Sequence, residues 1–113
     1  MKLVALAAII AALVVPSALA ATPTLTGTVG PGFTITLKKG TAKVTKLKAG
    51  SYVIKVSDKS KIHNFRLKGP GVNKTTTVGG TGTSTWKVTL KKGKYTIVCD
   101  PHASIMKGTF TVS

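Results

Sequence analysis

Hydrophobic and polar residues alternate with a period of two in several short segments of the chain after residue 21. Such alternation is typical of β-strands that bury one face and expose the other, and the 3.6-residue period of an amphipathic helix is missing. Turns rich in glycine and proline separate these segments. The clearest alternating segments are 33–37, 52–56, 86–90, 95–99 and 110–112. The pattern predicts an all-β protein of seven to eight short strands, arranged as an antiparallel sandwich or small barrel.

The same alternation predicts which side chains face the core. His63 has the parity of Phe65 and Leu67, and Cys99 has the parity of Ile97. Residues two positions apart on a strand share one face of the sheet. We therefore expect His63 and Cys99 to point inward from strands, and the aromatic residues to occupy core positions.

A Leu-x-x-Gly-x-Tyr pattern occurs twice, ending at Tyr52 and at Tyr95. This entry into a strand resembles a tyrosine corner, in which the phenolic hydroxyl bonds nearby backbone across a Greek-key connection. Tyr95 is expected to fix the start of the strand that leads to Cys99. For Tyr52, an ordinary turn followed by a half-buried tyrosine fits the sequence equally well.

The first twenty residues have the pattern of a secretory signal peptide. Lys2 gives a short basic start, residues 3–15 are an unbroken apolar run, and Ala18-Leu19-Ala20 supplies a small-residue cleavage pattern. A membrane-spanning helix needs about 20 apolar residues, so an uncleaved anchor fits less well. We expect residues 1–20 to be removed on export and residues 21–113 to form one domain, periplasmic or extracellular.

The chain is strongly basic, with 17 Lys and Arg residues against two acidic residues and a net charge of +15. A field of this strength attracts acidic proteins, anionic cell-surface polymers or nucleic acid, with a steep dependence on salt. The alternative is that the lysines only solvate the outer faces of strands. The sequence leaves both interpretations open.

The rare residue types of the chain gather in one short segment. Residues 21–113 contain one cysteine, one methionine and two histidines, and Cys99, His102 and Met106 lie within eight positions, while His63 comes earlier. Two imidazoles and a thiolate with a weak axial thioether are the ligands of a blue-copper site. Thiolate and thioether suit Cu(I), and imidazole suits Cu(II). The composition therefore predicts one copper ion bound by these four residues.

Two further residues are candidates for supporting this site. Pro101 lies between Cys99 and His102, where it lacks a backbone N–H and limits both hydrogen bonding to the sulfur and the flexibility of the loop. Asn64 follows His63 and points away from it. Its side chain is a candidate to bond the backbone near Cys99 or Asp100 and so connect the two ligand segments.

The order and spacing of these residues resemble the plastocyanin/azurin family of cupredoxins, most closely in the Cys-x-Pro-His run. The resemblance covers essentially all of residues 21–113. It rests on His63-Asn64-Phe65 and on Tyr95-x-x-x-Cys99-x-Pro101-His102-x-x-x-Met106-x-Gly108-x-Phe110.

The resemblance implies an eight-stranded Greek-key β-sandwich with a type 1 copper site at one end and one-electron transfer as its function. It assigns His63, Cys99, His102 and Met106 as ligands, and the edge of His102 as the electron exit through an apolar patch. Candidates for that patch are Ala103, Ile105, Pro101 and Pro70. The loop between His102 and Met106 is one residue shorter than in plastocyanin, which leaves the copper–thioether distance and the reduction potential open.

Three functions can be weighed from the sequence. An electron carrier, expected to be a monomer that meets acidic redox proteins, is the leading interpretation. A copper storage or delivery protein would need the same ligands. A basic polyanion-binding module is less well supported, because a chain with one arginine and core-facing aromatics is poorly suited to specific nucleic-acid binding. Four ligands leave no open position for a substrate, so we do not expect an enzyme.

Overall fold

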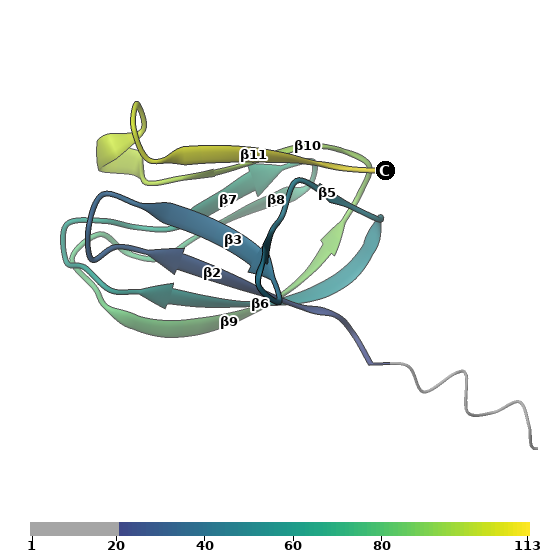
Figure 1. Cartoon of the computed structure of the whole chain (residues 1–113), viewed down its shortest axis with the longest axis horizontal. Coiled ribbons are helices and arrows are strands. Elements are labelled where there is room, and N and C mark those ends of the chain that lie inside the picture. Colours follow the sequence, from purple (N-terminus) through teal and green to yellow (C-terminus); the bar gives the residue numbers. More distant parts are fainter. Residues whose placement is uncertain (1–20) are drawn as a thin grey trace, which may run out of the picture.

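Two five-stranded β-sheets pack face to face in this computed structural model (Figure 1), which describes residues 21–113. The predicted signal peptide, residues 1–20, lies outside the described residues. Eight strands have four residues or more, and two short strands have two residues each. The elements are β2 (Thr24–Val29), β3 (Ile35–Lys39), β4 (Ala42–Lys43), β5 (Lys46–Leu47), β6 (Gly50–Asp58), β7 (Arg66–Gly69), β8 (Val72–Thr75), β9 (Gly82–Leu90), β10 (Gly93–Val98), the 3₁₀ helix η3 (Asp100–His102) and β11 (Lys107–Val112).

The strand order confirms the expected all-β sandwich. Sheet I has the order β4-β3-β2-β6-β9, and sheet II has the order β5-β11-β10-β7-β8. The chain passes repeatedly from one sheet to the other, so strands that are neighbours in sequence often lie in different layers. None of the helical segments in residues 21–113 has the length and apolar character needed to cross a membrane.

The sandwich is mainly antiparallel, as expected, but two of its strand pairings are parallel. β2 pairs with β6 in parallel, and β11 pairs with β5 in parallel, whereas the other pairings are antiparallel. Turn signals in a sequence predict only hairpins between consecutive strands. Here β3, β4 and β5 return the chain to the end where β2 began, so β6 runs in the same direction as β2.

The core lies between the sheets and follows the predicted alternation. Along β6, Tyr52, Ile54 and Val56 are buried while Ser51 and Lys55 are exposed. Trp86 of β9 is partly buried and packs edge-on against Phe65, with ring centroids 6.1 Å apart. Burial of these apolar faces is the main force that holds the two sheets together.

Both repeated tyrosines form hydrogen bonds of the tyrosine-corner type. The hydroxyl of Tyr52 donates to the carbonyl of Lys48 at 2.7 Å, which settles the open alternative in favour of the corner. The hydroxyl of Tyr95 accepts from the backbone N–H of Lys91 and donates to its carbonyl, both at 2.9 Å. A side chain at Gly69 would collide with the ring of Tyr95, so this corner requires glycine on the adjacent strand.

Replacing Tyr95 by Phe is expected to lower the free energy of unfolding by about 1–3 kcal/mol, because it removes two partly buried hydrogen bonds, to the N–H and the carbonyl of Lys91. Tyr52→Phe is the matched control and should lose about 1 kcal/mol, since its hydroxyl bonds one carbonyl. Urea unfolding of both variants measures the difference. A larger loss of the free energy of unfolding for the Tyr52 variant would contradict the conclusion that the Tyr95 hydroxyl contributes more to stability.

Candidate metal centre

The predicted ligand residues meet at one end of the sandwich, shown at the left in Figure 1. His63 lies in the connection between β6 and β7, Cys99 follows β10 directly, and His102 is the last residue of η3. Met106 immediately precedes β11. The inward orientation of His63 and Cys99 is confirmed, but their placement on strands is wrong. Both residues lie just beyond strand ends, where the backbone is free to leave the sheet and bring side chains together.

Three donor atoms converge at this end. The Nδ1 atoms of His63 and His102 are 3.1 Å apart, and each lies 3.6 Å from the Sγ of Cys99. His63 and Cys99 are fully buried, whereas His102 is partly exposed. A buried thiol and two imidazoles are thus held in a nearly equilateral triangle.

The dimensions of this triangle fit a first-row transition metal ion. A point equidistant from the three atoms lies roughly 2 Å from each, close to the lengths of about 2.0–2.1 Å and 2.3 Å for metal–imidazole and metal–thiolate bonds. Cys99 is a free cysteine, so its sulfur is available as a ligand. Two imidazoles and one thiolate are the equatorial donors of blue-copper sites. The residues present therefore fit copper.

Met106 belongs to the same loop as Cys99 and His102. Its backbone N–H donates to the carbonyl of His102 at 2.8 Å, and its carbonyl accepts from the N–H of Cys99 at 3.0 Å. The residue is buried, with 1% of its surface exposed. These bonds close the loop and keep the thioether-bearing residue beside the other two, while its role as axial ligand stays a prediction.

Asn64 connects the two segments that carry His63 and Cys99. Its Oδ1 accepts from the backbone N–H of Asp100 at 2.7 Å, the contact that the sequence suggested. Its Nδ2 donates to the carboxylate of Asp100 at 2.8 Å and to the hydroxyl of Thr75 at 2.9 Å. Because both ends of this buried amide are satisfied, the distance between the two segments is fixed.

Sequence reasoning missed an ion pair that supports this connection. Arg66 donates from Nε and Nη2 to the carboxylate of Asp100 at 2.8–3.0 Å, and from Nη1 to the side chain of Asn73 at 2.7 Å. The Arg66 guanidinium holds the pKa of Asp100 below its usual value, burial opposes this effect, and the bond from Asn64 lowers the pKa further. The available signal was compositional: the only arginine of the chain and one of its two acids lie close to the ligand motif.

Phe33 was also missed, and its expected core position is wrong. β3 begins at Ile35, so the bend before it takes Phe33 off the strand and leaves it 54% exposed. Its ring stands edge-on to both imidazoles, with centroids 5.1 Å from His63 and 4.9 Å from His102. Phe33 therefore covers the outer side of the two histidine rings.

Three of the four residues predicted for the apolar patch around His102 lie there, and the fourth, Pro70, does not. Ile105 is 66% exposed on the ligand loop, and Pro101 and Ala103 are exposed beside it. Pro70 lies at the opposite end of the sandwich, where its ring approaches Gly93 at the start of β10. A linear motif does not show at which end of a sandwich a distant turn lies, and this explains the error.

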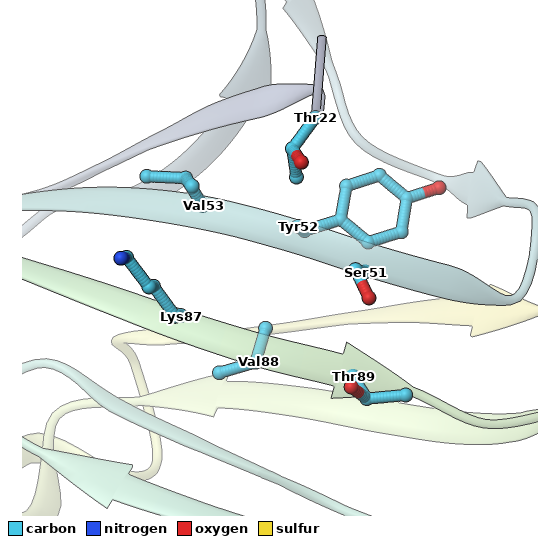
Figure 2. Close-up of a pocket in the computed structure, with 7 residues that line it drawn as sticks. All are labelled: Thr22, Ser51, Tyr52, Val53, Lys87, Val88 and Thr89. Atoms are coloured by element: carbon cyan, nitrogen blue, oxygen red, sulfur yellow. The ribbon is translucent and has the colours of Figure 1, made fainter. Parts of the chain in front are cut away.

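The pocket in Figure 2 is separate from the ligand cluster. It is an open depression along β6 and β9, and none of its lining residues is a histidine, cysteine or carboxylate. The lining residues are Thr22, Ser51, Tyr52, Val53, Lys87, Val88 and Thr89. The described residues that could hold a metal ion together, His63, Cys99 and His102, lie in the loops at the end of the sandwich instead.

Comparison with known proteins identifies the class of protein. The family model for the cupredoxin-like domain matches residues 3–112, and the chain belongs to this family. Among solved structures, reduced rusticyanin is similar with a TM-score of 0.59 and 20% identity, over 80% of this chain and 78% of that chain. Rusticyanin from Thiobacillus ferrooxidans has a TM-score of 0.55 and 20% identity, over 80% and 76% of the two chains.

A third similar structure is described as the copper protein rusticyanin, with a TM-score of 0.59 and 19% identity, over 80% of this chain and 76% of that chain. At this identity the likeness shows the fold. No curated protein sequence matches the chain. The assignment of individual ligands therefore rests on the geometry described above.

Acidification is expected to weaken the connection between Asp100 and Arg66. Because folding lowers the pKa of Asp100, its stabilisation is present above the unfolded value of about 4 and is lost as the pH falls through the folded value. The pair is partly exposed, so Asp100→Asn should lower stability at neutral pH by about 1 kcal/mol or less. Urea unfolding of the metal-free wild type and of the variant, at several pH values between neutral and acidic, measures the free energy of unfolding of each. The difference in the free energy of unfolding between the wild type and Asp100→Asn should shrink on acidification. If the two free energies instead fall in parallel with pH, the Asp100 carboxylate does not have this role.

Proposed function

We propose that residues 21–113 bind one copper ion and carry single electrons between redox partners. The observation that supports this most directly is the triangle formed by Sγ of Cys99 and Nδ1 of His63 and His102, with sides of 3.1–3.6 Å. Met106, buried on the same loop, supplies the fourth donor. Bound copper would provide a centre that alternates between Cu(I) and Cu(II).

The protein residues would hold the donors in place during electron exchange. Sulfur donors favour Cu(I) and imidazoles favour Cu(II), so the mixed set accommodates both oxidation states. Asn64 fixes the distance between the two ligand segments. Phe33 covers the histidine rings and limits the approach of water. A site that needs little rearrangement favours rapid electron exchange, and four donors leave no open position for a substrate.

The end of the sandwich around His102 is suited to contact with a redox partner. His102 is only partly buried, while Phe33, Ile62 and Ile105 expose 53–66% of their surfaces on loops at this end. Exposed apolar residues that gather on one surface mark sites of protein contact. This feature favours a carrier over a storage protein, which needs the same ligands but no docking surface.

Export and an acidic partner are further parts of the proposal. Residues 1–20 have the composition of a cleaved signal peptide, which supports a periplasmic or extracellular location. Residues 21–113 contain 16 Lys and Arg residues and two acidic residues, and this net charge of +14 would draw acidic redox proteins toward a monomeric carrier and make association sensitive to salt.

Replacing Cys99 by Ser is expected to abolish the intense visible absorption of the copper(II) protein, because the thiolate donor is lost. Absorption and electron paramagnetic resonance spectra measure this change. Met106→Leu is the control, since it removes the weak axial donor and keeps the equatorial triangle, so its colour should persist. A wild-type copper(II) protein without intense colour would contradict the proposed site.

Ile105→Glu tests the exposed apolar end. A charge at this position should slow electron self-exchange by about tenfold or more, because two copies must bring these ends together and the contact would bury a carboxylate without a partner. The absorption spectrum should not change, since the Ile105 side chain points to solvent. Val53→Glu, on a distant strand of sheet I, is the matched control and should leave the rate nearly unchanged. Equal slowing by both variants would argue against contact through this end.

A further inference from the structure

The outer face of sheet I carries a row of cationic and hydroxyl side chains that crosses all five strands. The cross-strand register places Lys43 opposite Lys38, Lys38 opposite Thr26, Thr26 beside Lys55, and Lys55 opposite Thr85. All five residues are exposed, and the residues that flank them on β2 and β6 point into the core. With strands about 4.8 Å apart, this lysine–threonine row is roughly 19 Å long.

The row contains an unfavourable arrangement that the protein itself does not neutralise. Like charges directly opposite each other on neighbouring strands destabilise a sheet, and Lys38 and Lys43 form such a pair. Within residues 21–113 the ion pair in the structure is Arg66–Asp100, and the other acidic residue, Asp58, is buried. An anion bound across the row would remove this repulsion.

The chemistry of the row distinguishes among anionic partners. It contains no aromatic ring on which a nucleic-acid base could stack and no arginine for bidentate phosphate contacts. It also has no large apolar side chain to insert into a lipid surface. Ammonium groups and hydroxyls suit a partner that combines negative charge with many hydroxyl groups. We propose that the lysine–threonine row binds an anionic polysaccharide, with its carboxylates at the lysines and its hydroxyls at the threonines.

This surface is separate from the candidate metal centre. The row crosses the middle of sheet I, whereas the ligand residues lie in loops beyond the strand ends. If the proposed electron transfer is correct, a chain held on a polymer through this face would keep the His102 end free for a redox partner. Polysaccharide binding itself does not depend on the metal.

The test is binding of the purified chain to alginate, a carboxylated polysaccharide, at about 0.15 M salt. Lys38→Gln/Lys43→Gln/Lys55→Gln should weaken binding on the order of a hundredfold. The matched control, Lys68→Gln/Lys74→Gln/Lys94→Gln, removes the same charge from exposed positions on strands of sheet II. Sheets pack about 10 Å apart, beyond the screening length of about 8 Å, so the control should bind nearly as wild type.

Neutral dextran, duplex DNA and vesicles containing phosphatidylserine complete the experiment. Tighter binding to alginate than to all three supports the proposal. Equal weakening by the two triple variants would show that net charge alone acts, and tighter binding to DNA or vesicles would identify another class of partner; either result overturns the proposal. The copper spectrum, recorded in parallel, tests the metal centre independently, because a colourless protein that still binds alginate contradicts only the proposed function.

Discussion

The hydrogen bonds of Asn64 are the constraint on which the ligand geometry depends. His63 and Cys99 are 36 positions apart in the chain, and the strands nearest to them, β7 and β10, pair over three residue pairs. The buried amide of Asn64 satisfies the N–H and the carboxylate of Asp100 at once, so a shift of either segment would break two bonds. Leaving a buried amide without a hydrogen-bond partner costs more free energy than one hydrogen bond contributes to stability. These bonds therefore hold the segments that carry His63 and Cys99 beside each other.

Most of the fold and the donor set could be predicted from local features of the sequence. Alternation identified the main strands, because one face of each strand is buried and the other is solvated. His63, Cys99 and His102, which the structure brings together, could be singled out because histidine and cysteine are rare in this chain and two of the three residues lie in one short loop. The corner at Tyr95 was predictable from its spacing to the preceding glycine. Each of these signals lies within a few residues of the feature that it predicts.

The features that escaped prediction depend on contacts between distant parts of the chain. The parallel pairing of β2 with β6 arises only after the chain has crossed between sheets. The Arg66–Asp100 pair joins residues 34 positions apart. The place of Phe33 over the histidine rings depends on where β3 begins and on how close its loop comes to η3. Alternation gives the face of a residue within a strand, but it gives neither the exact ends of the strand nor the loops that meet beyond them.

The large positive charge acts on partners far more than on the candidate metal centre. Two unit charges separated by roughly 15 Å interact through water with about 0.3 kcal/mol, and screening at physiological salt reduces this several-fold. Burial and the identity of the donor atoms act on a bound ion at bond distance, so their effect is much stronger than that of distant lysines. Residues near the candidate metal centre and residues on the strands can therefore serve different purposes. The buried sulfur and imidazoles would set the properties of an ion bound there. If both proposals hold, the exposed lysines on the strands attract anionic partners, and the exposed apolar side chains on the loops around His102 form the surface for close contact.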